Sequence, residues 1–196
     1  MNRPGEPRLV LASASPRRAA ILGRLGVPFR VAVSDAPEDL LPGEAADTAC
    51  VRLARVKAER VAAGEALPVL AADTLVVCDG RILGKPETPD AAAAMLRLLS
   101  GRTHDVVTGV CLWWEGQARS GLERTAVEFA PLSDAEVEAY VGSGEPMGKA
   151  GAYHVDGAGS LFIRRIDGSP SNVAGLPVRL LSRLAREAGV DLGLPG

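Results

Sequence analysis

Apolar and polar positions repeat with two different periods along the chain, and the two periods predict interleaved strands and helices. Apolar runs predict strands over residues 8–12, 29–33 and 68–78 and around residues 161–163. Amphipathic or alanine-rich stretches predict helices over residues 16–25, from Asp47 or Thr48 to about Ala63, and over about 177–188. Between them, the proline- and acid-rich residues 34–44 predict a loop.

Turn and capping residues mark further elements. Asp79-Gly80 predicts a tight turn into a return strand over residues 81–83. Thr88 as N-cap and Pro89 at the first helical position predict the start of a helix, and Gly101 predicts its end.

The second half of the chain adds a strand pair and another helix. Residues 106–114 and 125–129 predict two antiparallel strands. Ser133 and Glu136 form the capping box of a helix that extends to about Tyr140. Since helices, strands and hairpins interleave, we expect an α/β fold with a mixed twisted sheet flanked by helices.

Length and composition restrict the class of protein. The 196 residues suit one domain, expected over residues 8–196, after a loose polar tail over residues 1–7. No apolar run reaches the roughly 18 residues of a membrane span, and the first residues lack a signal-peptide pattern, so we expect a cytoplasmic protein with no membrane partner. A net charge of -2 without a basic run argues against nucleic acid as a partner.

The cysteine, histidine and glycine patterns exclude several kinds of site. Cys50, Cys78 and Cys111 are an odd number at wide spacing, which predicts reduced, buried thiols rather than a disulfide framework or a zinc site. With 2 histidines, a His-rich metal site is excluded. The segments "GEPMGKA" and "GAGSLF" match neither a Walker A loop nor a dinucleotide-binding fingerprint.

The stretch "LASASPRRAAIL" predicts an anion site at the start of a helix. Ser15 fits the N-cap and Pro16 the first helical position, so the first-turn amides point away from the helix. The hydroxyls of Ser13 and Ser15, these amides, and Arg17 with Arg18 would converge on a phosphate. A capped helix with two solvated arginines remains the alternative.

Two acids are candidates for metal binding or catalysis. Asp73 interrupts an apolar strand, where a carboxylate is costly unless it is paired or holds a cation. A hydrogen bond to Thr74 or to a backbone amide is the structural alternative. Glu38, in the acidic loop, would join Asp73 in holding Mg²⁺, or it is a solvated loop acid.

Lysine is rare, which draws attention to each one. Of 22 lysines and arginines, only Lys57, Lys85 and Lys149 are lysine. Lys57 shares a helical stripe with apolar residues and points inward or snorkels. Lys85, between Gly84 and a proline, is expected near the strand of Asp73. Cations for phosphates beside acids for a metal suit chemistry on a phosphoanhydride.

The ordered motifs "SASPRR", "AADT", "ILGKP", "LSGRTHDVVTGV", "YVGSGEPMGKAGAY" and "NVAGLP" resemble the Maf family of nucleoside triphosphate pyrophosphatases, also called septum-formation inhibitor proteins. The resemblance implies an ITPase-like fold of two lobes around a deep cleft, and metal-dependent cleavage of a nucleoside triphosphate to the monophosphate and pyrophosphate. It also implies a homodimer and Mg²⁺ or Mn²⁺ as cofactor.

The same resemblance implies roles for individual residues. Asp73 matches the proton acceptor and, with Glu38, is expected to hold the metal. The cationic residues that match the family's phosphate-neutralising positions are Arg17, Arg18, Lys57 and Lys85.

The segment "GKAGAY" resembles the branch of the family that acts on dTTP and UTP. Arg17, Thr74 and Asp156 match positions associated with substrate choice, and Asp156 stands where that branch usually has glutamine. A carboxylate only accepts hydrogen bonds whereas an amide also donates them, so base preference stays open. A pyrophosphatase for modified nucleotides, such as those of the 7-methyl-GTP type, and a nucleotide-binding regulator of cell division with little catalysis are the alternatives.

Overall fold

The structure, a computed structural model, describes residues 6–194. Residues 1–5 of the loose tail expected over residues 1–7 lie outside the described residues. Within residues 6–194, no helix combines the length and the apolar character needed to cross a bilayer.

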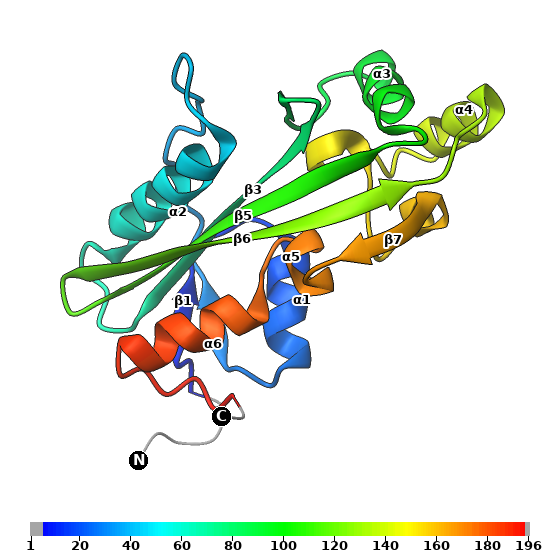
Figure 1. Ribbon diagram of the computed structural model, residues 1–196. Helices are drawn as coiled ribbons and strands as arrows, with labels where there is room; N and C mark the ends of the chain where they lie inside the picture. The colour runs from blue at the N-terminus through cyan, green and yellow to red at the C-terminus, as the bar shows by residue number, and fades with distance from the viewer. Residues whose placement is uncertain (1–5, 195–196) are drawn as a thin grey trace. The chain divides into compact units, whose positions relative to one another are not determined.

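Seven strands of the described chain form one sheet in the order β2-β1-β3-β5-β6-β7, with β4 paired to β3 (Figure 1). The strands are β1 (Leu9–Leu11), β2 (Phe29–Val31), β3 (Val69–Cys78), β4 (Arg81–Leu83), β5 (Thr103–Trp114), β6 (Gln117–Phe129) and β7 (Ile163–Asp167). Strand β1 pairs in parallel with β2 and β3, whereas β4 and β7 pair antiparallel with β3 and β6. The expected mixed sheet is confirmed.

Helices flank this sheet, which confirms the α/β class. They are α1 (Pro16–Arg24), α2 (Ala46–Ala62), α3 (Pro89–Leu99), α4 (Asp134–Gly142), α5 (Pro170–Val173) and α6 (Val178–Glu187), with 3₁₀ helices η1 (Ala150–Ala152) and η2 (Ala158–Phe162). The hydroxyl of Thr88 accepts a hydrogen bond from the Ala91 amide at the start of α3, and Ser133 with Glu136 forms the capping box of α4. Both predicted caps are therefore confirmed.

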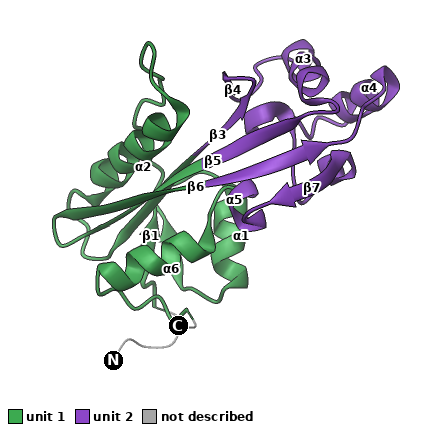
Figure 2. Ribbon diagram, in the orientation of Figure 1, with its two compact units in different colours: residues 1–73, 108–123, 175–196 green, residues 74–107, 124–174 purple. Residues whose placement is uncertain are grey.

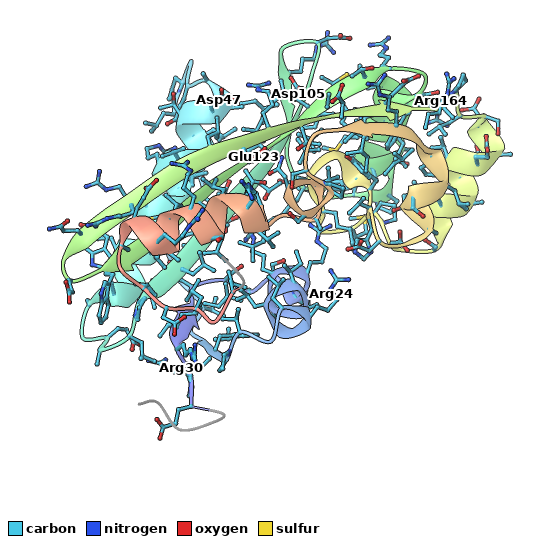
Figure 3. The ribbon with its side chains drawn as sticks, turned by 60° about the horizontal axis from the view of Figure 1, so that its bottom comes forward. Arg24, Arg30, Asp47, Asp105, Glu123 and Arg164 are labelled. Carbon is cyan, nitrogen blue, oxygen red and sulfur yellow. The ribbon has the colours of Figure 1, made fainter. Side chains whose placement is uncertain are left out.

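The start of α2 differs from the prediction. The helix begins at Ala46 with Ala45 at the N-cap, and no side chain caps it, so Asp47 and Thr48 are not its caps. Asp47 instead lies in the first turn (Figure 3), where a carboxylate favours the positive end of the helix dipole.

Strand lengths also differ from the prediction. Strands β5 and β6 are longer than expected because a turn at Glu115 and Gly116, both with positive φ, joins them directly into one long hairpin. The strand expected around residues 161–163 begins only at Ile163, since Leu161 belongs to η2. The apolar run there predicted an element but not its type.

The chain divides into two compact units, coloured green and purple in Figure 2. The first contains the chain up to Asp73, Thr108–Glu123 and the chain from Gly175, and the second contains Thr74–Val107 and Arg124–Ala174. Each unit has its own internal packing.

In the first unit, helices α2 and α6 lie on opposite sides of the strands (Figure 1). Glycines on the strands allow both helices to approach closely. A Cβ atom on Gly109 of β5 would lie 2.3 Å from the carbonyl carbon of Cys50 on α2, and one on Gly121 of β6 would lie 2.6 Å from Leu180 on α6. The buried residues between α2 and the strands are Val10, Ala12, Ala54, Ala58, Val69, Ala71 and Cys111.

The second unit is built around an aromatic cluster of His104, Phe129, Tyr140, Tyr153 and Phe162. The ring of His104 packs edge-on against Phe129 and Tyr153, at centroid distances of 4.9 Å and 5.4 Å, and its Nε2 lies 3.0 Å from the Tyr153 hydroxyl. Burial lowers the pKa of His104 to about 4, although the Asp105 carboxylate raises it. The imidazole is therefore neutral at neutral pH.

The three cysteines are buried and free, as expected. Burial raises the pKa of the Cys78 and Cys111 thiols, which keeps them protonated at neutral pH. They are packing residues.

Candidate active site

The strand-to-helix turn after β1 brings two of its predicted phosphate ligands together. Ser15 occupies the N-cap of α1 with an extended backbone, and Pro16 takes the first helical position, as predicted. The Ser15 hydroxyl makes no capping hydrogen bond to the helix. Instead the Ser13 hydroxyl, which is buried, accepts from the Ser15 amide at 3.2 Å and from Arg18 Nη1 at 3.0 Å.

Arg18 is fixed inside the first unit rather than solvated. Its Nε donates to the Gly175 carbonyl oxygen at 2.8 Å, in addition to the bond from Nη1 to Ser13. Burial lowers the pKa of Arg18, whereas the nearby Asp73 carboxylate raises it. Arg24, at the end of the same helix, is exposed (Figure 3). The alternative of two solvated arginines is therefore wrong for Arg18.

Lys57 joins both predicted acids. Its Nζ lies 2.5 Å from Asp73 Oδ1 and 2.8 Å from Glu38 Oε1. Lys57 and Asp73 are each 7% exposed, so their contact is buried, whereas Glu38 reaches Lys57 from the exposed loop. The ammonium does not snorkel to solvent, and the buried Asp73 has a cationic partner.

Three different elements position these groups. Lys57 extends from the buried face of α2, the face that also carries Cys50 and Leu53, as its helical spacing predicted. Asp73 lies within β3, and Glu38 lies in the loop that precedes α2. Because a buried ion pair repays its desolvation only with close geometry, the short distances indicate a precisely held cluster.

The chemistry of this cluster fits a divalent cation. The described residues contain no group of three or more His, Cys, Asp or Glu side chains able to hold a metal, and this cluster contains two carboxylates, those of Asp73 and Glu38. Two carboxylates suffice for Mg²⁺, which commonly takes one or two carboxylates and completes its shell with water and substrate phosphate oxygens. The Lys57 ammonium already contacts both carboxylates, so an ion bound here would have to share them with Lys57.

Arg17 belongs to the same electrostatic environment. It is half-buried on the first turn of α1, and its charge lowers the pKa of Arg18 while Asp73 and Glu38 raise it. Two guanidinium groups and two carboxylates thus lie close enough in the first unit to influence one another.

The remaining predicted residues lie in the second unit. Thr74 is half-buried on β3, Lys85 is exposed in the connection from β4 to α3, and Asp156 is exposed between η1 and η2. Lys85 does follow a strand that pairs with β3, at Leu83 opposite Val76.

Comparison with known proteins identifies the family of the chain. The model of the Maf-like protein family matches residues 8–188. The chain belongs to the Maf family.

Two relatives within the family match almost their whole length. A dTTP/UTP pyrophosphatase of Anaeromyxobacter dehalogenans is 49% identical over 191 residues, which cover 95% of this chain and 96% of that protein. A dTTP/UTP pyrophosphatase of Moorella thermoacetica is 50% identical, with 94% of this chain and 97% of that protein covered. Among solved structures, a dITP/XTP pyrophosphatase of Mycobacterium abscessus aligns with 92% of this chain and 94% of its own, at 18% identity and a TM-score of 0.44.

Two Maf-family motifs have structural roles that the sequence did not reveal. The motif "NVAGLP" supplies the Gly175 carbonyl that receives Arg18. In "YVGSGEPMGKAGAY", the Glu145 carboxylate accepts hydrogen bonds from the Tyr140 hydroxyl and from the Ala158 and Gly159 amides, at 2.8 Å, 3.1 Å and 3.0 Å. Burial raises the pKa of Glu145, but the hydrogen bonds lower this pKa by more than burial raises it, so the carboxylate stays ionised. The ionised carboxylate closes the loop that contains Asp156. The motifs marked these residues without indicating their partners.

Proposed function

We propose that this chain hydrolyses dTTP and UTP to the nucleoside monophosphate and pyrophosphate. The observation that carries the proposal is the contact of one buried ammonium, Lys57, with both Asp73 and Glu38. The substrate class is supported by relatives that are about half identical over nearly the whole chain and are named for dTTP and UTP.

Asp73 is the proposed base. Its carboxylate would orient a water molecule and accept its proton as the water attacks the phosphoanhydride next to the α-phosphorus. Lys57 holds Oδ1 at 2.5 Å, which fixes the orientation of the carboxylate. A base held at one oxygen needs little reorganisation when the proton moves.

The cations near Asp73 would bind the triphosphate. Arg17 and Arg18 at the start of α1, together with the first-turn amides, would neutralise phosphate oxygens, and Lys85 would add a further positive charge. Ser13 and Gly175 already restrict the Arg18 guanidinium, so its binding geometry is preorganised. This part of the site favours an anionic ligand.

Asp73 and Glu38 would hold a Mg²⁺ or Mn²⁺ ion. Such an ion, when bound, supplies positive charge to the phosphate oxygens as negative charge develops there. Lys57 would then share the two carboxylates with the ion, and the positive charge that the ion adds would be offset by the phosphate oxygens of the substrate.

We propose that Thr74, Asp156 and Arg17 recognise the base. Asp156 is exposed, and its carboxylate only accepts hydrogen bonds. It would therefore accept from the N3–H that thymine and uracil both carry.

The proposed function is tested by pyrophosphate release from dTTP, UTP, CTP, GTP, ATP and 7-methyl-GTP with Mg²⁺ or Mn²⁺, with a chelator as the blank. We expect release from dTTP and UTP, and a decrease in kcat of about 10²–10⁴-fold for Asp73→Asn with nucleotide binding retained. Asp35→Asn, which changes an exposed acid of the same loop as Glu38, is the matched control.

Each other outcome has a distinct meaning. Unchanged turnover in Asp73→Asn would remove Asp73 as the base. Release from 7-methyl-GTP instead of dTTP would assign the chain to another substrate, and binding without release from any nucleotide would favour the regulator of cell division.

A further inference from the structure

The loop that carries Glu38 has little secondary structure of its own. Residues 34–45 between β2 and α2 contain neither strand nor helix. Within the loop, the Ala36 amide donates to Ser34 Oγ and the Glu44 amide donates to the Leu41 carbonyl. The Glu38 carboxylate contacts Lys57, but Glu38 is itself exposed, so the backbone that carries it needs contacts from outside the loop to hold it in place.

Arg52 on α2 supplies these contacts. Its Nε donates to Glu44 Oε1 and its Nη2 to Glu44 Oε2, each at 2.7 Å, which is the two-point geometry that a guanidinium offers a carboxylate. The same Nη2 donates to the Asp39 carbonyl oxygen at 3.0 Å. Asp39 directly follows Glu38, so the bond fixes the backbone next to the acid.

Glu44 continues the link into the loop. Its Oε2 also accepts a hydrogen bond from the Leu41 amide at 3.2 Å, and its side chain is 7% exposed. One carboxylate thus connects α2 with two parts of the loop, while most of the loop is in contact with solvent.

The pair is ionised at neutral pH. The hydrogen bond with Arg52 lowers the pKa of Glu44, and that with Glu44 raises the pKa of Arg52. The Asp73 carboxylate raises the pKa of Arg52 as well, so the pair lies within the electrostatic field of the proposed site.

We propose that Arg52 is a positioning residue that, through Glu44 and the Asp39 carbonyl, holds the loop so that Glu38 reaches Lys57. Arg52 and Lys57 belong to one helix, so the element that carries the ammonium also sets the position of its exposed acidic partner. The inference rests on the proposed function, since it assigns to Arg52 the contacts that position Glu38 in the proposed active site. It requires an arginine, because a lysine cannot bond both carboxylate oxygens and the carbonyl in one plane.

The chain offers a closely matched control. Arg60, on the same helix, forms an ion pair at 2.6 Å with Asp35, on the same loop, but both side chains are more than half exposed. Arg60→Gln therefore removes an arginine pair between α2 and the loop without removing a bond next to Glu38.

The test compares Arg52→Gln, Arg52→Lys, Glu44→Gln and the double variant Arg52→Gln/Glu44→Gln with Arg60→Gln. We expect Arg52→Gln to lower kcat about 10–100-fold and to raise the Mn²⁺ concentration for half-maximal activity, with KM for dTTP nearly unchanged, as for residues that orient a metal ligand. Arg52→Lys should recover little, and the double variant should be no worse than either single variant. Arg60→Gln should match the wild type.

Hydrogen exchange supplies a readout that is independent of turnover. In Arg52→Gln the amide of Leu41 should lose protection, and in Arg60→Gln it should keep it. A wild-type protein that releases no pyrophosphate would overturn the proposed function and, with it, the effect of Arg52 on turnover. Hydrogen exchange would still decide whether Arg52 holds the loop. With an active wild type, equal kinetics and equal exchange in Arg52→Gln and Arg60→Gln would overturn this inference alone.

Discussion

The two units of the molecule bury polar groups in opposite ways. In the first unit, the buried polar groups include a charged pair: Lys57 and Asp73 are in direct contact and interact with Glu38 and Arg18. In the second unit, the buried imidazole of His104 is neutral and packs among aromatic rings. Burying charged groups costs desolvation free energy, so such groups are expected where they act on a ligand. A neutral aromatic cluster has no such cost and stabilises the surrounding structure.

The largest effect should come from removing one charge in the first unit. Lys57→Met leaves the buried Asp73 without its ammonium, which should lower the free energy of unfolding by about 3–5 kcal/mol. Lys57→Met/Asp73→Leu should regain most of this stability, because the pair is replaced by apolar groups, and yet release no pyrophosphate. Urea unfolding and pyrophosphate release together check both parts. A Lys57→Met variant as stable as the wild type would show that the pair does not behave as a buried charge pair.

A smaller effect, dependent on pH, should come from the second unit. His104 has a folded pKa of about 4 against an ordinary 6.5, so as pH falls below 6.5 the unfolded chain takes up a proton that the folded chain does not. This difference should lower the free energy of unfolding by about 3 kcal/mol between pH 6.5 and pH 4. Above pH 6.5 the contribution is constant.

His104→Phe removes this titration and keeps an aromatic ring. The difference in unfolding free energy between wild type and variant should therefore change across this pH range, which urea unfolding at a series of pH values measures. A difference that does not vary with pH in His104→Phe would mean that the pKa of His104 is the same in the folded and the unfolded protein.

The smallest of the three effects concerns backbone conformation in the second unit. Gly151 has a φ of 70°, and a Cβ there would lie 2.9 Å from Val76 Cγ2. Gly151→Ala should cost about 1–2 kcal/mol for the left-handed backbone, with a further cost for the contact. Adding Val76→Ala should relieve the overlap at 151 but not the backbone cost. Thermal unfolding of the four proteins of this cycle checks the separation, and full additivity of the two substitutions would contradict it.

Local signals predicted much of the fold. Thr88 and Ser133 cap helices as expected, and Asp79 and Gly80 turn the chain with positive φ. These residues act on their immediate neighbours in the chain, so the sequence is sufficient to predict the caps and the turn. The start of α2 was wrong because Ala45 takes the N-cap without any side-chain signal.

The site was predictable as a set of groups but not as a set of contacts. Helical spacing predicted that Lys57 points inward, and the apolar strand predicted that Asp73 is buried. Neither pattern indicates that the two side chains meet. The bond from Arg18 to Gly175 joins residues separated by 157 positions, a contact that only the tertiary structure creates.

The missing side chain of Gly109 sets the depth at which α2 packs onto the sheet. A methyl group there would overlap the Cys50 backbone at 2.3 Å, where neither partner is a flexible side chain, so the helix would have to shift. Lys57 lies farther along that helix and would move with it, away from a partner that it now meets at 2.5 Å. Gly109 carries no functional group, yet it determines how close Lys57 lies to Asp73. Adding an uncharged methyl group there would therefore weaken the ion pair of the site, as a substitution of a charged residue would.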